Sequence, residues 1–151
     1  MANKRYDFSF NTDRCIKCWA CEVACQQWKS IKPGTIKLRK VTEITTGTFP
    51  AVQRKFFSET CRHCTDAPCA AACPEKAIYI REEDGIVLVD TEKCNGCRAC
   101  FDACPYGIPQ FNEEGKMQKC DMCLDRIQNG QEPICAATCP TLALRWRTVE
   151  K

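Results

Sequence analysis

Residues 94–105 read Cys-Asn-Gly-Cys-Arg-Ala-Cys-Phe-Asp-Ala-Cys-Pro, which is a Cys-x2-Cys-x2-Cys-x3-Cys-Pro run. Related runs occur at three other places, so the 16 cysteines of this 151-residue chain form four groups of four. This internal repeat uses every cysteine. The groups are Cys15, Cys18, Cys21 and Cys25; Cys61, Cys64, Cys69 and Cys73; Cys94, Cys97, Cys100 and Cys104; and Cys120, Cys123, Cys135 and Cys139.

The spacing within a run is typical of a ligand set for a cubane iron–sulfur cluster. The first three thiolates hold one 4Fe-4S cluster, and the fourth binds the cluster of a partner run. Three cysteines at positions i, i+3 and i+6 can reach three corners of one cube, and a proline after the fourth fixes the backbone direction toward a neighbour. Four such runs complete four clusters without a spare thiol. We therefore expect four 4Fe-4S clusters.

Zinc and disulfides are the alternative uses of so many cysteines. Structural zinc sites favour two cysteine pairs separated by a longer loop, and only the fourth group, with its gap between Cys123 and Cys135, has that form. Disulfides belong to secreted chains, whereas Met1 to Asp7 lacks the apolar segment of an export signal. No stretch approaches the roughly 20 apolar residues of a membrane span. We expect a cytoplasmic protein, with export in complex with a signal-bearing partner left open.

The composition predicts that the clusters replace an ordinary core. Val, Ile, Leu and Phe make up only about 19% of the chain, near the level at which burial alone fails to fold a protein. The formal net charge is +3. Sixteen thiolates and four oxidised cubane cores would change it to about −5.

Apolar and polar residues alternate in several places, which indicates strands. Residues 77–90 predict a hairpin between the second and third cysteine groups, with its turn at 81–85. Residues 35–40 and 53–57 predict a second hairpin around Thr45-Thr46-Gly47. We expect strands at 6–10 and 142–146 to pair with each other, and short helices to follow the x3 segments, most clearly at Glu22 to Lys29.

The hairpin at 77–90 joins groups two and three as the halves of a two-cluster ferredoxin are joined, and groups one and four remain to pair. This predicts an α+β fold of two ferredoxin-like units around a cluster-centred core. An outer unit of residues 1–58 and 105–151 carries the basic hairpin, and residues 59–104 form a unit inserted into it. The expected ligand sets are Cys15, Cys18, Cys21 and Cys139; Cys120, Cys123, Cys135 and Cys25; Cys61, Cys64, Cys69 and Cys104; and Cys94, Cys97, Cys100 and Cys73.

Residues 13–25, 61–74, 84–107 and 119–140 also carry the pattern of a known family. They resemble the four-cluster iron–sulfur subunits of molybdenum and tungsten pterin oxidoreductases, the group with the electron-transfer subunits of dimethyl sulfoxide reductase, formate dehydrogenase and polysulfide reductase. The resemblance covers residues 6–146. It implies a line of four clusters, docking to a separate pterin catalytic subunit, and no catalysis by this chain.

The shortness of the chain makes it similar to the small subunits of tungsten aldehyde oxidoreductases, which we take as the candidate partner. A free polyferredoxin shuttle and a subunit of a formate dehydrogenase or hydrogenase complex are the alternatives. Further expectations are a flavin or ferredoxin-type redox partner and self-stacking of copies. We expect no nucleic-acid partner and no membrane span.

Some single residues carry expectations of their own. His63, the only histidine, is expected to be exposed in its loop. The tryptophans Trp19, Trp28 and Trp146 are expected to serve in packing. Cations next to cysteines are candidates for tuning reduction potentials or for plain surface charge; these are Lys17, Arg62, Lys93 and Arg98. A further group of cations is expected on a solvated strand face, with partner docking as the other interpretation; these are Lys32, Lys37, Arg39, Lys40, Arg54 and Lys55.

Overall fold

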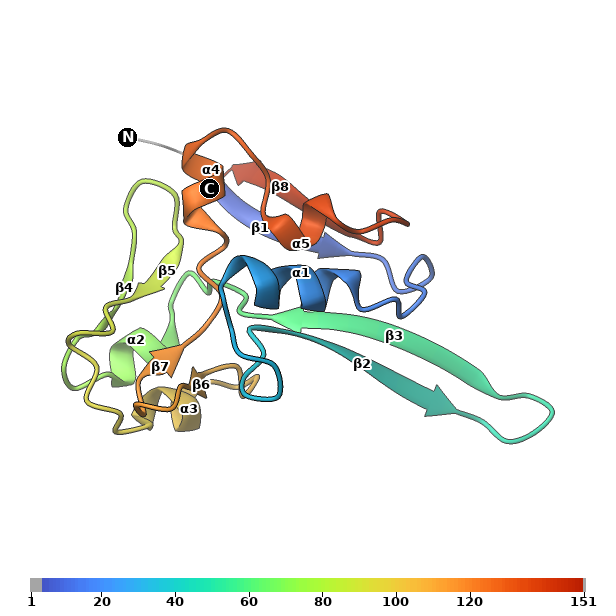
Figure 1. Ribbon diagram of the computed structural model, residues 1–151, viewed down its shortest axis with the longest axis horizontal. Helices are drawn as coiled ribbons and strands as arrows, with labels where there is room; N and C mark the ends of the chain where they lie inside the picture. The colour runs from blue at the N-terminus through green and yellow to red at the C-terminus, as the bar shows by residue number, and fades with distance from the viewer. Residues whose placement is uncertain (1–3, 151) are drawn as a thin grey trace.

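A computed structural model describes residues 4–150 as short helices and two-stranded antiparallel sheets (Figure 1). The predicted α+β class is confirmed. Residues 1–3 and 151, the ends of the expected outer unit, lie outside the described residues. The strands are β1 Lys4–Phe10, β2 Arg39–Thr46, β3 Gln53–Thr60, β4 Ile78–Ile80, β5 Val87–Val89, β6 Gln110–Phe111, β7 Met117–Gln118 and β8 Leu144–Glu150. The helices are α1 Ala20–Trp28, α2 Pro68–Ala72, α3 Ala99–Ala103, α4 Leu124–Gln128 and α5 Ile134–Ala137.

The two terminal strands pair with each other, as the sequence predicts. β1 and β8 are antiparallel, with Phe8 opposite Trp146. The Tyr6 ring stacks on Trp146 at 4.8 Å between centroids. β8 begins two residues later than predicted because Leu142 has a left-handed backbone, with φ of 54°, and belongs to the preceding turn. The first and last described segments of the chain therefore form one sheet.

Both predicted hairpins are present, but the first strand of the second is displaced. Residues 35–38 lie outside any strand, and Thr45 and Thr46, which were expected in the turn, belong to β2. β4 pairs with β5, and the turn between them contains Gly85 at φ 71°. β2 pairs with β3 and projects well beyond the rest of the chain in Figure 1. At its tip, Gly47 has φ of 82°, and a Cβ there would collide with the carbonyl oxygen of Ala51. A third hairpin, β6 with β7, was not predicted, because two-residue strands give no alternation to detect.

Prolines determine where α2 and α3 end. The residue before a proline is driven out of helical geometry, and Cys73 and Cys104, which precede Pro74 and Pro105, have extended ψ angles of 113° and 115°. α1 continues to Trp28 because Gln26 stands where the other groups have proline. The helix expected at Glu22 to Lys29 is present as α1. The helices α2, α3 and α5 overlap the x3 segments, so the prediction that helices follow these segments is wrong in position there, and α4 lies in the longer gap between Cys123 and Cys135.

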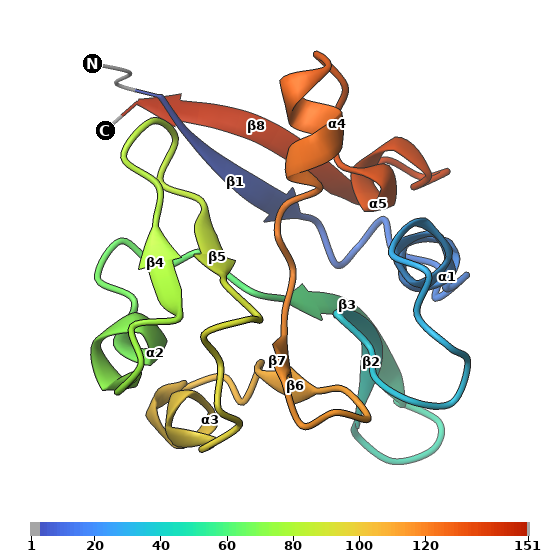
Figure 2. The same ribbon diagram turned by 60° about the vertical axis from the view of Figure 1, so that its left-hand side comes forward.

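The helices pack in pairs. α1 lies against α5, and α2 lies against α3, on opposite sides of the view in Figure 2. Near α2 and α3, a buried cluster has partly buried cysteines packed against it; its members are Ala67, Ile78, Val87, Cys100 and Met117. Thiols therefore belong to the interior of the fold.

Glu22 links α1 to β2, and its loss should weaken the fold. Its carboxylate is buried and accepts hydrogen bonds from the Val41 N–H at 2.8 Å and from Lys37 Nζ at 2.5 Å. Glu22→Ala should destabilise the fold by about 1–3 kcal/mol, because the partly buried N–H loses its acceptor. A lower midpoint for thermal loss of the visible cluster absorbance would show this. The matched control is Glu59→Ala on the exposed face of β3, expected to stay within about 0.5 kcal/mol; equal midpoints for both variants would contradict the prediction.

Candidate metal centres

Two small cavities are each lined by four cysteines. One is lined by Cys15, Cys18 and Cys21 of the first run and by Cys139 of the fourth. The other is lined by three cysteines of the third run and one of the second, namely Cys94, Cys97, Cys100 and Cys73. Each cavity thus combines three thiols from one run with the last thiol of another, the combination that the cubane spacing predicts.

The thiol of Cys25 lies among cysteines of the fourth group. Burial, and then the neighbouring thiols of Cys120, Cys135 and Cys123, raise its pKa to about 12. Burial also raises the pKa of Cys123 to about 12, and the thiols of Cys120 and Cys135 add to that shift. Four close thiols in an apolar setting resist ionisation unless a cation compensates them. Iron would supply that charge.

The remaining cysteines gather near α2 and α3. The Cys69 thiol is close enough to Cys104 and to Cys61 for their charges to interact. Cys64 and Cys69 pack against the same buried cluster of apolar residues. Burial is the largest cause of the raised pKa at both Cys61 and Cys69.

The loops around the cysteines have an unusual backbone that suits a bulky anion. Lys17 and Trp19 flank Cys18 with φ of 55° and 57°, and Gly96 and Arg98 flank Cys97 with φ of 74° and 65°. Such conformations turn successive N–H groups toward a concave surface, as in many Fe–S and phosphate sites. In residues other than glycine they cost about 1–3 kcal/mol each and concentrate at functional sites. The left-handed conformations recur at the same positions of two runs, which indicates that both loops are shaped for the same kind of ligand.

Backbone N–H groups donate to several cysteine sulfurs, including those supplied by neighbouring hairpins and turns. Hydrogen bonds of this kind tune the potential of a bound cluster. The donor and acceptor pairs are His63 N to Cys61 Sγ at 3.4 Å, Ala77 N to Cys73 Sγ at 3.3 Å, Met117 N to Cys94 Sγ at 3.4 Å, Met122 N to Cys120 Sγ at 3.3 Å and Leu144 N to Cys139 Sγ at 3.4 Å. At Cys139, burial favours the neutral thiol, but such bonds outweigh it and lower the pKa.

The donor set fits 4Fe-4S clusters in chemistry, because thiolates are the usual ligands of such clusters. All 16 cysteines lie within residues 4–150, and none of them forms a disulfide. Over the same residues, no three His, Cys, Asp or Glu side chains converge on a position for a single metal ion. The assignment of each cysteine to a cluster remains a prediction.

Three buried polar residues near the cysteines were missed by the sequence reasoning. His63 is 1% exposed, so the prediction of an exposed histidine is wrong; its Nδ1 accepts the Val87 N–H at 3.0 Å, and burial lowers its pKa well below the usual value. Arg39 is 2% exposed and does not lie on the solvated hairpin face. Lys119 is also buried, with Nζ donating to the carbonyl oxygens of Val87 and Cys120.

The cations expected to tune potentials have partners near the surface. Lys17 pairs with Glu43, and Lys93 pairs with Asp90 at 3.5 Å. Arg62 stacks on Tyr106 at 4.1 Å, and Arg98 on Phe111 at 4.9 Å. Of the tryptophans, Trp19 and Trp28 are nearly half exposed, and Trp19 lines the cavity of Cys15 and Cys18.

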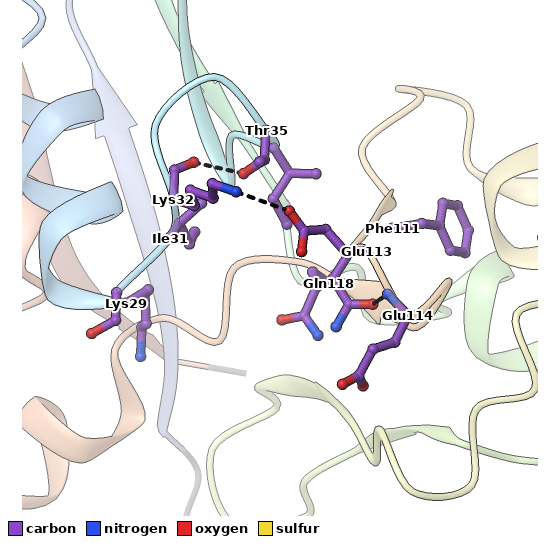
Figure 3. Close-up of a pocket in the computed structure, with 11 residues that line it drawn as sticks. Lys29, Ile31, Lys32, Thr35, Phe111, Glu113, Glu114 and Gln118 are labelled. Carbon is purple, nitrogen blue, oxygen red and sulfur yellow. Dashed lines mark hydrogen bonds and ion pairs between the residues drawn. The ribbon is translucent and has the colours of Figure 1, made fainter.

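A larger cavity, of about 530 Å³, lies between the loop after α1 and the β6–β7 hairpin (Figure 3). Lys32 and Glu113 face each other across it at 3.5 Å. Its lining within residues 4–150 includes no cysteine. Phe111 lines both this groove and the cavity of Cys94 and Cys97, so the groove adjoins one of the thiol clusters.

Among the described residues, no helix has the length and apolar character to cross a membrane.

Comparison with known proteins agrees with this geometry. Residues 52–149 match the 4Fe-4S dicluster domain. The chain is 39% identical to the B component of the anaerobic dimethyl sulfoxide reductase of Escherichia coli (strain K12), over 97% of this chain and 75% of that protein. It is 39% identical to the formate dehydrogenase iron-sulfur subunit of Wolinella succinogenes, over 93% and 80%. It is 34% identical to the B component of the sulfite dehydrogenase of Allochromatium vinosum, over 85% and 62%. With three of its four cysteine groups inside the matched segment, this protein belongs to the 4Fe-4S dicluster family.

Proposed function

We propose that this chain is a non-catalytic subunit that relays single electrons along four 4Fe-4S clusters between a pterin catalytic subunit and a second redox partner. The observation that carries the proposal is the convergence of three thiols from one run with a fourth from another, seen in full around two cavities. The proposed ligand sets are Cys15, Cys18, Cys21 and Cys139; Cys120, Cys123, Cys135 and Cys25; Cys61, Cys64, Cys69 and Cys104; and Cys94, Cys97, Cys100 and Cys73.

The clusters supply one-electron redox chemistry, and the chain supplies the conditions for it. The thiolates hold the clusters, and backbone N–H groups such as that of Leu144 donate to their sulfurs. Burial of Cys25 and Cys135 keeps water away from the thiols. No bond of a substrate needs to be made or broken in such a relay, which fits a subunit without catalytic residues.

The relatives support a molybdenum or tungsten pterin enzyme as the partner, because they are named as parts of dimethyl sulfoxide reductase, formate dehydrogenase and sulfite dehydrogenase. A tungsten aldehyde oxidoreductase is the narrower proposal from the sequence. The formate dehydrogenase alternative has the support of a relative with 39% identity. A flavin or ferredoxin-type protein is proposed at the other end of the relay.

We also propose that residues 59–104 form a ferredoxin-like unit inserted into an outer unit of residues 1–58 and 105–151. The pairing of β1 with β8 in the outer unit and of β4 with β5 in the inserted unit supports this division, and the end of β3 at Thr60 extends two residues past the proposed boundary. We also propose a cytoplasmic location, as expected from the sequence. Stacking of copies into longer conductors is a further proposal.

Anaerobic purification from the native source tests the relay. We expect a stable complex that contains tungsten or molybdenum and about 16 Fe per copy of this chain, as four cubanes require. An iron–sulfur protein that emerges alone at every step would support a free polyferredoxin shuttle instead. About four zinc ions and no iron would contradict both.

A further inference from the structure

Arg39, at the start of β2, is a buried cation whose hydrogen bonds are incomplete. Its side chain is 2% exposed. Nη1 donates to the Ser58 hydroxyl at 3.0 Å and to the Ser58 carbonyl oxygen at 3.3 Å, and the guanidinium lies 4.6 Å from the centre of the Phe8 ring. Nη2 is buried and has no acceptor among residues 4–150. This guanidinium can still donate to a group that is absent from the protein itself.

Arg39 also lacks a carboxylate partner. Ion pairs within the described part of the chain involve Lys17, Lys29, Lys32, Lys37, Arg81, Lys93 and Arg147 but not Arg39. A buried charge is costly unless a counter-charge compensates it. The folded protein therefore needs an anion close to this residue.

The cysteine sites supply candidates for that anion. The guanidinium of Arg39 lies close enough to the Cys25 and Cys135 thiols for its charge to act on both, and close enough to Cys135 for a hydrogen bond between the two side chains. It also acts on Cys21, whose Sγ lies 3.3 Å from the Ser58 hydroxyl that Arg39 holds. Cys21 belongs to one proposed ligand set, and Cys25 and Cys135 belong to another. Arg39 therefore lies between two sites.

We propose that Arg39 is the buried counter-charge shared by two clusters, those of Cys15, Cys18, Cys21 and Cys139 and of Cys25, Cys120, Cys123 and Cys135, and that it raises the reduction potential of both. This inference rests on the proposed function. A cubane with four thiolate ligands is an anion, and it gains one further negative charge when it accepts an electron. A fixed cation beside it stabilises the reduced form more than the oxidised form, and neither a proton nor a bond needs to move.

The test is a potentiometric titration of the anaerobically purified, cluster-loaded chain, followed by electron paramagnetic resonance. Arg39→Met should lower the equilibrium constant for reduction of two of the four clusters about tenfold, which is about 59 mV for a one-electron couple. Arg39→Lys keeps the charge, so the potentials of these clusters should differ from wild type by no more than about a third of that shift. The matched control is Arg54→Met, which removes an exposed cation from the same hairpin and should leave all four clusters close to wild type.

Other results either refute the inference or test it through iron content in place of reduction potential. Wild-type potentials in a loaded Arg39→Met variant, an equal shift in Arg39→Lys, or an equal shift in Arg54→Met would each refute it. If Arg39→Met loads fewer clusters, the iron content of Arg39→Lys decides the question. Full iron content in Arg39→Lys would support the need for a positive charge, and an iron loss equal to that of Arg39→Met would refute the inference. Absence of iron–sulfur clusters from the wild-type chain would refute the proposed function itself, before any variant is compared.

Discussion

Removal of iron should unfold most of the chain. Of the 16 buried apolar residues other than proline among positions 4–150, five are cysteines and four are alanines, so little hydrocarbon remains to hold the fold without the clusters. The free energy of unfolding of a typical protein is only about 5–15 kcal/mol. Metal binding of this kind is coupled to folding. Near-UV circular dichroism after anaerobic chelation should therefore show no fixed tertiary structure.

The control for this experiment is the same protein carried through the procedure with a chelator too weak to bleach the visible cluster absorbance. It should retain its near-UV signal. Limited proteolysis gives an independent measure, with the iron-free chain cut within α1 and β8 as readily as in its loops. A native near-UV spectrum in a fully bleached sample would contradict the prediction.

Pairs of cysteine substitutions should show which thiols share a cluster. Cys25→Ser removes one proposed ligand from the site of Cys120, Cys123 and Cys135. Adding Cys120→Ser damages the same site again, whereas adding Cys139→Ser damages a second site. If each damaged site loses its cluster, the Cys25 and Cys120 double variant should hold about 12 Fe per chain and the Cys25 and Cys139 double variant about 8.

The comparison depends on whether the iron losses of two single substitutions add in the double variant. They should add when the two cysteines belong to independent sites and not when they belong to the same site. Iron and labile sulfide would be measured in chains purified in parallel, with Cys139→Ser alone as the reference for the second site. Equal iron content in the two double variants would show that the pairing of Cys25 with the fourth run is wrong. The experiment therefore tests the ligand sets without a structure of the loaded protein.

The features predicted from the sequence are those encoded by short spacings. The cysteine runs, the prolines after Cys73 and Cys104 and the alternation around residues 77–90 act locally, and the expected hairpins and strand pairing are present. Helix positions were less accurate, since the x3 segments that join cysteines are themselves helical.

Features that depend on distant contacts could not be predicted in this way. Arg39 follows an ordinary basic stretch, and only its approach to Phe8 and Ser58 buries it. His63 looks like a loop residue until Val87, from the β4–β5 hairpin, donates to its ring. Burial of Lys119 likewise depends on the Val87 carbonyl oxygen. In each case a buried polar side chain is identified by a partner that is remote in sequence.

The pairing of β1 with β8 makes closure of this sheet depend on two segments that are synthesised far apart in time. Chains are synthesised from the N-terminus at about 5–20 residues per second, so β1 leaves the ribosome well before its partner β8. An unpaired strand edge is a template for association with other chains, and charged side chains such as Lys4, Arg5 and Asp7 along β1 disfavour that outcome. The β2–β3 and β4–β5 hairpins can form before β8 has been synthesised, whereas the sheet of β1 and β8 closes only after β8 has left the ribosome.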